Sequence, residues 1–264
     1  MGKMLFGRYI PVDSFLHKMD PRAKLLITIL FIVVVFLANN TVTYALLGLY
    51  TFLAIYSSNI PIKFILGGFK ILLWLIFFTF FLHIFFTRGG EVILQIGQFK
   101  VYEYGLQQGI FISLRFFFLI LMTGLLTLTT TPIEITDGME SLLNPFKKIR
   151  FPVHEFALMM SIALRFIPTL MDETDKIMKA QIARGVDFSR GSLKERAQNF
   201  IPLLIPLFIN AFKRAEDLAI AMEARGYRGG EGRTKYRVLK WEIRDTMALL
   251  SLFVLAVVLF VFRS

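Results

Sequence analysis

The sequence predicts an all-α polytopic membrane protein with about five transmembrane helices and a cytoplasmic region of long amphipathic helices. The chain of 264 residues is 56% hydrophobic, contains 29 Phe and has a mean hydropathy of +0.63, which is more apolar than an ordinary soluble domain. Lys, Arg, Asp and Glu are all absent from residues 25–62, 71–87 and 246–262, as expected of helices that cross a bilayer. A net charge of +11 beside such stretches is typical of membrane proteins with basic cytoplasmic loops.

Residues 1–131 are predicted to form an N-terminal transmembrane region with about four spans. Basic residues outnumber acidic ones in residues 1–24, which predicts a cytoplasmic N-terminus. The stretch 25–58 is too long for one span and is interrupted by Asn39-Asn40-Thr41, so it predicts a hairpin of two short spans. A third span, rich in Phe, is expected at 71–87, and an outer loop follows it.

The fourth span is predicted over 106–130 and contains Arg115. An arginine inside a span is a candidate functional residue, but this one is near enough to the start of the span for its side chain to reach the outer interface. Both interpretations stay open. The next residues, Thr131-Pro132-Ile133-Glu134, predict a helix start, because Thr is a good N-cap, Pro suits the first helical position and Glu completes a capping box.

Residues 132–240 are predicted to form a cytoplasmic helical domain, because 18 Lys and Arg and 13 Asp and Glu alternate there with apolar stripes. A short helix is expected at 132–148, and longer helices at 152–184 and 193–225. The first half of each longer helix is almost free of charge, which predicts contact with lipid or with an apolar partner. Kinks are expected at the prolines inside the longer helices, Pro168, Pro202 and Pro206.

A C-terminal transmembrane helix is predicted within residues 241–264. Its apolar stretch, 246–262, is preceded by Lys240, Arg244 and Asp245. Basic residues on this side predict that the helix starts in the cytoplasm and ends outside the cell.

The most distinctive feature of the sequence is a motif that occurs twice. Residues 180–185 read Ala-Gln-Ile-Ala-Arg-Gly and residues 221–226 read Ala-Met-Glu-Ala-Arg-Gly. Either copy alone is typical of a helix C-terminus, because Arg complements the helix dipole and Gly adopts a left-handed stop. Two copies with matching small residues favour a second interpretation, in which two helix ends offer the same side chain to two similar binding sites. The residues concerned are Ala183, Arg184, Gly185, Ala224, Arg225 and Gly226.

Residue patterns for catalysis are absent from the sequence. The chain has no Cys, its three histidines are scattered, and it contains neither a G-x-x-x-x-G-K-[ST] loop nor a serine nucleophile elbow. The acidic group Asp172-Glu173-Asp175 is followed at helical spacing by Lys176 and Lys179, which predicts a solvated helix face. We therefore expect a non-catalytic subunit without cofactor or metal. Nucleic acid is not an expected partner, because the membrane spans account for the basic excess.

Taken together, these features resemble the transmembrane T component (EcfT) of energy-coupling factor (ECF) transporters, which import vitamins and metal cofactors. The resemblance covers essentially the whole chain. It is carried by the two Ala-Arg-Gly boxes and by four further motifs: Ser14-Phe15-Leu16-His17-Lys18-Met19-Asp20-Pro21-Arg22-Ala23-Lys24, Thr129-Thr130-Thr131-Pro132-Ile133-Glu134, Pro152-Val153-His154-Glu155 and Ala163-Leu164-Arg165-Phe166-Ile167-Pro168.

The resemblance implies an ECF-type ABC importer of vitamins in the cell membrane. In it, residues 132–240 couple two ABC-type ATPase subunits (EcfA and EcfA′ type) to a membrane S component that binds the substrate. It implies that Ala183-Arg184-Gly185 and Ala224-Arg225-Gly226 sit in grooves of the two ATPases. The kinked apolar segments would hold the S component, and we place that surface at Met159, Met160, Ile162, Ala163, Pro168, Pro202, Leu203, Leu204, Pro206 and Leu207.

Three other classes fit less well. A complete ABC permease with its own pore usually carries one E-A-A-x-x-x-G loop, and Glu223-Ala224 continues differently. A membrane enzyme acting on lipid headgroups needs clustered acidic or histidine residues, whereas the acidic residues here are dispersed. A purely structural membrane scaffold would leave the ATPase activity of its complex unchanged.

Overall fold

The computed structural model divides the chain into two compact units. Unit 1 comprises Met1–Leu142 and Val238–Ser264, and unit 2 comprises Leu143–Arg237. The helix that begins at Pro132, where the sequence predicts the start of the cytoplasmic region, packs with unit 1. Met1 and Ser264, which the predicted topology places inside and outside, lie outside the described residues. The described residues are 9–61, 64–65, 70–96, 99–188, 190, 192–229 and 237–263.

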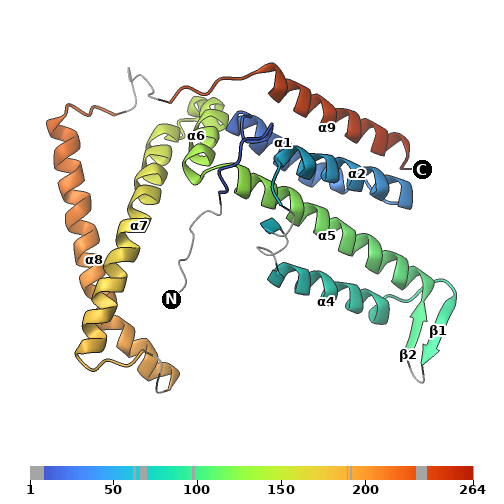
Figure 1. The fold of residues 1–264 in the computed structure, drawn as a ribbon, viewed down its shortest axis with the longest axis horizontal. Coiled ribbons are helices and arrows are strands. Elements are labelled where there is room, and N and C mark those ends of the chain that lie inside the picture. The colour runs from blue at the N-terminus through green and yellow to red at the C-terminus, as the bar shows by residue number, and fades with distance from the viewer. Residues whose placement is uncertain are drawn as a thin grey trace. The chain divides into compact units, whose positions relative to one another are not determined.

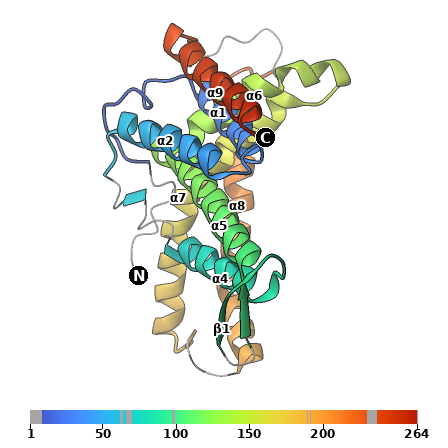
Figure 2. The same cartoon turned by 90° about the vertical axis from the view of Figure 1, so that its right-hand side faces the viewer.

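Unit 1 consists mainly of apolar helices, seen in Figures 1 and 2. They are α1 (Pro21–Val35), α2 (Thr41–Ser58), α4 (Lys70–Phe86), α5 (Glu103–Thr129), α6 (Pro132–Leu143) and α9 (Ile243–Val261). The predicted spans correspond to α1, α2, α4, α5 and α9, so the expected helical membrane fold is confirmed.

The length and composition of the helices give a different set of spans from the predicted five. Among the described residues, four helices are long and apolar enough to cross a membrane: α2, α5, α9 and α7 (Val153–Ala183). The sequence predicts that α7 belongs to the cytoplasmic domain, because only its first half is apolar. The helices α1 and α4 have 15 and 17 residues, which is at or below the short end of the usual transmembrane range.

Local side-chain hydrogen bonds set the helix starts that the sequence predicts. At α6, the Thr131 amide donates to Glu134 Oε2 at 2.8 Å, and the Glu134 amide donates to Thr131 Oγ1 at 3.3 Å. The predicted capping box is thereby confirmed. Asn40 caps α2 in the same reciprocal manner with Thr43, so the second helix of the first hairpin starts at the predicted break. Each cap supplies acceptors for amides that have no partner within the helix.

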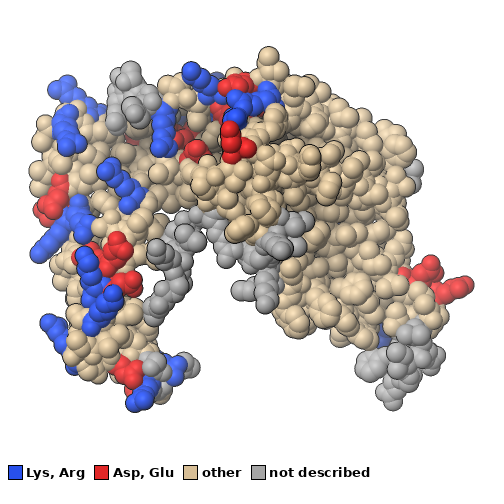
Figure 3. Space-filling view, in the orientation of Figure 1, with Lys and Arg blue, Asp and Glu red and all other residues tan. Residues whose placement is uncertain are grey.

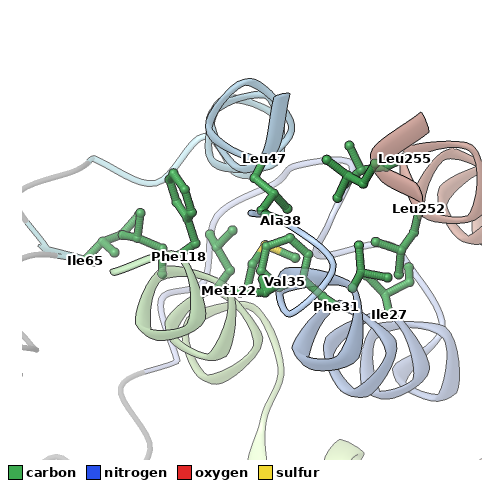
Figure 4. Packing of buried hydrophobic residues seen from close by; sticks show 14 of the residues in the cluster. Ile27, Phe31, Val35, Ala38, Leu47, Ile65, Phe118, Met122, Leu252 and Leu255 are labelled. Carbon is green, nitrogen blue, oxygen red and sulfur yellow. The ribbon is translucent and has the colours of Figure 1, made fainter. Parts of the chain in front are cut away.

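The core of unit 1 lies where α1, α2, α5 and α9 meet. Figure 4 shows side chains from these helices converging, among them Phe31, Leu47 and Leu252, which are almost completely buried. The opposite faces of these helices expose many large apolar side chains. Such an arrangement suits helices surrounded by lipid rather than by water.

The pair α4 and α5 lies side by side in both views and is held closely by two glycines (Figures 1 and 2). A Cβ on Gly105 would lie 2.8 Å from the Thr87 carbonyl oxygen and 3.0 Å from that of His83, and one on Gly109 would lie 3.3 Å from that of Phe80. Glycine at these positions therefore lets the backbone of α5 touch the end of α4, as in other membrane helix pairs.

The segment between α4 and α5 is a β-hairpin, where the sequence analysis expected a plain loop. Strands β1 (Val92–Ile96) and β2 (Phe99–Tyr102) pair antiparallel, with an irregularity between Val92 and Leu94. The branched and aromatic residues of both strands favour this conformation. The hairpin is too short for a clear alternating pattern, which explains why it was missed.

A buried polar network joins the first turns of α1 and α9. The Asp245 side chain is 0% exposed; its Oδ1 accepts from the Asp20 amide at 2.9 Å and its Oδ2 from the Glu242 amide at 2.8 Å. Asp20 in turn caps α1 and accepts from the Arg22 guanidinium at 2.8 Å. Two helices separated by more than 200 residues are thus joined through one carboxylate.

The residues before α1 are tied to the same end of unit 1. Lys24 Nζ donates to the Thr129 carbonyl at 2.9 Å and to the His17 carbonyl at 3.3 Å. The His17 ring bonds the Ile10 carbonyl at 2.9 Å through Nε2 and Ser14 Oγ at 2.6 Å through Nδ1. Burial lowers the pKa of His17, in keeping with a neutral ring that donates to Ile10 and accepts from Ser14.

Arg115 contacts the turn between α1 and α2. One of its terminal nitrogens donates to the Ala38 carbonyl at 3.3 Å, and the guanidinium lies 5.1 Å from the centre of the Phe36 ring. A positive charge at this place compensates the partial negative charge at the C-terminal end of the α1 dipole, and it also stacks on the face of an aromatic ring. The structure therefore gives Arg115 a packing partner at the end of a neighbouring helix.

Unit 2 is a hairpin of two long helices preceded by a short 3₁₀-helix. The 3₁₀-helix η1 (Asn144–Ile149) leads into α7, and α8 (Leu193–Ala224) returns alongside it. Both long helices continue through their prolines. Figure 1 shows α8 bent near its start, and the expected kink sites Pro202 and Pro206 lie in this first half of α8.

Removing the Asp245 carboxylate tests the polar network. Asp245→Ala leaves the buried amide of Asp20 without an acceptor, at a cost of about 1–3 kcal/mol, and it also removes the acceptor of the partly buried Glu242 amide. We expect a clearly lower midpoint of thermal unfolding for the purified protein in detergent, with Asp245→Asn in between. The control Asp13→Ala removes an exposed carboxylate that pairs with Lys18 and is expected to change nothing. Equal midpoints for Asp245→Ala and this control would contradict the role of the network.

A second test addresses the close contact of α4 and α5. Gly105→Ala places a methyl group against two backbone oxygens that cannot rotate away, so we expect a loss of about 1–3 kcal/mol from overpacking. The matched control is Gly48→Ala in α2, where a Cβ would meet only the Phe118 ring at 3.4 Å. That variant is expected to unfold at the same temperature or higher, because Ala favours helix over Gly. The idea fails if both variants melt alike.

Candidate functional site

The first Ala-Arg-Gly box ends α7 in a Schellman motif. Arg184 is the C-cap, and Gly185 has a φ of +89°. The Val186 amide donates to the Gln181 carbonyl at 3.0 Å, and the Gly185 amide donates to the Ile182 carbonyl at 3.0 Å. This pair of bonds defines the motif and explains the need for a residue that tolerates positive φ.

The second box ends α8 in the same way. Arg225 is the C-cap, and Gly226 has a φ of +77°. The Tyr227 amide donates to the Met222 carbonyl at 3.0 Å, and the Gly226 amide donates to the Glu223 carbonyl at 2.9 Å. The repeated motif therefore produces the same backbone conformation twice, with an arginine at the same position in each.

All six residues of the two boxes, Ala183 to Gly185 and Ala224 to Gly226, are exposed. Within the described part of the chain, neither the Arg184 nor the Arg225 guanidinium has a hydrogen-bond or ion-pair partner. Among the described residues, apart from each glycine and its chain neighbours, no heavy atom lies within 4 Å of a Cβ built on Gly185 or Gly226. Glycine is thus needed here for its backbone conformation, and the space around it is open to another molecule.

The two boxes lie at opposite ends of the hairpin (Figure 1). The helices are antiparallel, because contacts pair the end of α7 with the first half of α8: Gln181 Nε2 donates to the Pro202 carbonyl at 3.3 Å. Arg184 therefore lies near the start of α8 and Arg225 at its other end. The 32 residues of α8 span at most about 48 Å, which is enough separation for the two arginines to reach two different subunits.

A polar contact between the two helices holds the middle of the hairpin. Asn210 Nδ2 of α8 donates to Glu173 Oε1 of α7 at 2.5 Å, and the Arg214 guanidinium lies 3.4 Å from Glu173 Oε2. The sequence predicts a solvated helix face for the acidic group Asp172-Glu173-Asp175 with Lys176 and Lys179, and Asp172, Asp175 and both lysines are exposed. Glu173 departs from that prediction, because its side chain contacts α8 and is only 18% exposed.

The apolar residues predicted to hold a membrane partner have different environments. Met159 is 60% exposed and Leu204 55%; Met160, Ala163, Pro168 and Pro202 are also exposed, while Ile162, Pro206 and Leu207 are partly buried. Leu203, by contrast, is only 4% exposed. In this structure Leu203 is therefore part of the interior of unit 2 and not of its surface.

An open apolar depression of about 520 Å³ lies in unit 2. Leu204 and Leu207 line it, whereas Met159, Met160, Ile162 and Ala163 do not, so the predicted residues form two separate surfaces. Its other lining residues are Leu170, Ile205, Phe208, Ile209 and Ala211. The sequence analysis missed Ile205 and Phe208, although their three- to four-residue spacing with Ile201 and Phe212 along an exposed apolar face is the signal that identifies them.

Figure 3 shows both positively and negatively charged side chains along α8 of unit 2. The visible face of the α2 and α5 region is almost free of charged side chains. No group of three or more His, Asp or Glu side chains in the described residues is arranged to hold a metal ion. The features of unit 2 that point to a function are therefore its two exposed arginine-bearing helix ends and its apolar surface.

Comparisons with known proteins agree on one family. The CbiQ family model, described as "Cobalt transport protein", matches residues 13–236. The chain is 63% identical over 264 residues to the "Energy-coupling factor transporter transmembrane protein EcfT" of Bacillus subtilis and 55% identical over 264 residues to that of Listeria innocua. It is 51% identical over 264 residues to that of Streptococcus thermophilus, and in all three cases the match covers 100% of both chains. The chain thus belongs to the CbiQ family and, within it, to the energy-coupling factor transporter transmembrane proteins.

Proposed function

We propose that this chain is the coupling subunit of an ECF-type ABC importer. It transmits ATP-driven motion of two ATPase subunits to a membrane S component that binds a vitamin or another micronutrient. The observation that supports this most directly is the pair of matching helix ends, each with an exposed arginine that has no partner within the described chain. A transporter subunit with two such ends can bind two similar ATPases, one at each end.

Each residue of the two boxes has a physical role in this binding. Arginine presents a planar fork that binds a carboxylate through two parallel hydrogen bonds, which lysine does not reproduce. Ala183 and Ala224 precede the arginines and leave room for the partner surface to approach. Gly185 and Gly226 turn the chain sharply away from the helix end, so that the following residues do not block the arginine.

Transmission of movement requires that the two helices move together. The contacts of Glu173 with Asn210 and Arg214, and of Gln181 with Pro202, join α7 and α8 near their crossing. A displacement of either helix end by its ATPase is then passed to the whole hairpin. The exposed apolar residues of the first halves, such as Met159 and Leu204, would pass it on to the S component.

In this arrangement residues 132–240 form the cytoplasmic coupling domain, between the transmembrane regions 1–131 and 241–264. The basic residues of the N-terminal segment and of this domain support a cytoplasmic location for both. The chain itself is non-catalytic, and ATP is hydrolysed by the partner ATPases. The absence of a phosphate-binding loop from the sequence supports this division of labour.

Charge reversal at the helix ends tests the proposal. Arg184→Glu or Arg225→Glu should abolish substrate uptake and detach the ATPases, because each places a carboxylate against an acidic partner. Single Ala variants should be milder and the double Ala variant much worse, since stranding the partner of a desolvated ion pair costs about 2–5 kcal/mol. The measurements are uptake by cells and co-purification of the ATPases in mild detergent.

The control for these variants is Lys213→Ala, which removes one exposed positive charge from the middle of α8. We expect it to leave both uptake and co-purification unchanged. If the double variant Arg184→Ala with Arg225→Ala transports normally with both ATPases bound, the arginines are helix caps only and the proposal is wrong.

A bulky residue on the apolar surface tests the S-component contact. Ala163→Trp adds an indole to an exposed position of the apolar half of α7, so it should reduce recovery of the S component while the ATPases stay attached. Ala219→Trp, exposed in the charged half of α8, is the matched control and should have no effect. Equal recovery of the S component with both variants would remove Ala163 from the interface.

A further inference from the structure

The short turn that opens unit 2 combines exposed apolar and basic side chains. This basic-aromatic turn comprises residues 144–151, which are η1 and the two residues after it. Its large apolar side chains are exposed: Phe146 48%, Ile149 72% and Phe151 46%. Its cations are exposed as well: Lys147, Lys148 and Arg150. Neither the coupling proposal nor the comparisons assign it a role.

The backbone conformation of the turn decides which of these side chains lie next to each other. A 3₁₀-helix has three residues per turn, so Phe146 and Ile149 share one edge and Lys147 lies on the next. The turn is closed by Arg150, whose φ is +60° and whose amide donates to the Lys147 carbonyl at 3.0 Å. The Phe151 amide also donates back to the Phe146 carbonyl at 3.4 Å. Apolar and basic side chains are therefore held next to each other in this turn.

The basic side chains of the turn are not neutralised within the chain. No Asp or Glu occurs between Glu140 and Glu155 in the sequence. In the described parts of both units, Lys147, Lys148 and Arg150 have no ion-pair partner. The turn therefore offers positive charge and apolar surface together to something outside this chain.

The turn is joined through the chain to a helix that packs in unit 1. It follows α6 directly, and α6 packs on the first turns of α1: a Cβ on Gly138 would lie 3.0 Å from Leu25 Cδ1 and 3.3 Å from Pro21 Cβ. This end of α1 is also where the cations Arg22 and Lys24 lie. The first residue of the turn is thus bonded to a helix that packs where the apolar helices of unit 1 give way to polar residues, which in a membrane protein is the headgroup region.

We propose that residues 144–151 anchor the start of unit 2 to anionic phospholipids. Phe146, Ile149 and Phe151 insert at the boundary of headgroups and acyl chains, and Lys147, Lys148 and Arg150 bind lipid phosphates. Interleaved aromatic and basic residues are the composition of interfacial membrane anchors. A bilayer surface presents a negatively charged headgroup layer directly beside an apolar acyl layer, so it suits the basic and the apolar side chains along the whole turn. A protein partner would instead need acidic and apolar groups that alternate within about two residues.

The anchor depends only on the membrane location of the family and not on the coupling mechanism. The test uses the whole transporter complex in lipid nanodiscs made of phosphatidylcholine alone or with added phosphatidylglycerol. Because the chain has no Cys, Ile149→Cys can carry a single environment-sensitive fluorophore, and spin-labelled lipids report its contact with the bilayer. Ile182→Cys, which is 55% exposed at the other end of α7, is the matched control position.

We expect strong quenching of the label at 149 and little at 182, with the quenching at 149 increased by phosphatidylglycerol. Replacing Lys147, Lys148 and Arg150 by Gln should remove this increase, because each cation near an anionic surface is expected to favour the bound state about fivefold. Attachment of the ATPases, measured on the same samples, should not change. This separates a failed anchor from a failed coupling mechanism.

Three outcomes would overturn the proposal. The first is a label at 149 that is quenched no more than the label at 182. The second is equal quenching with and without phosphatidylglycerol, which shows apolar contact without recognition of anionic lipid. The third is a label at 149 that is shielded from lipid in the whole complex, which assigns the turn to a partner subunit.

Discussion

The buried contact between Asp20 and Asp245 is the interaction on which the arrangement of unit 1 depends most. Its helices are apolar on nearly every side, so apolar packing alone gives little preference for how their ends align. The Asp245 carboxylate accepts from backbone amides at the starts of both α1 and α9, and Lys24 adds the end of α5. A buried polar group is satisfied in very few arrangements, so we infer that this network selects the one observed.

Unit 2 depends on a different balance. Among its described residues only Val153, Ala157 and Leu203 are buried and apolar, so α7 and α8 hold together through a few contacts centred on Glu173. Large apolar side chains such as Phe208 remain exposed, which is unfavourable in water. A hairpin with this surface is suited to being completed by other molecules. The two arginine ends, the apolar depression and the basic-aromatic turn are four separate surfaces on which partners or lipid can bind.

Much of the fold and part of the candidate site follow from local sequence. The positions of the long helices were predicted from runs without charge, because a membrane helix needs continuous apolar residues. Both Ala-Arg-Gly ends were predicted for a similar reason: a Schellman motif involves only six consecutive residues, and Gly is the residue that adopts its left-handed position. The β-hairpin was missed because β1 and β2 are short. The burial of Leu203 was missed because only the contact of α7 with α8 decides which apolar residues are covered.

The sequence by itself determined the helices, their caps and the conformation of the two arginine ends, because these depend on hydrogen bonds between residues at most five positions apart. Only the tertiary structure decided which distant groups meet: Asp245 with Asp20, and Glu173 with Arg214 instead of the lysines in its own helix. It also decided that the two arginines lie at opposite ends of one antiparallel hairpin. The two side-chain contacts join residues 41 and 225 positions apart, and the pairing of such distant residues depends on how whole helices pack, which no local pattern in the chain specifies.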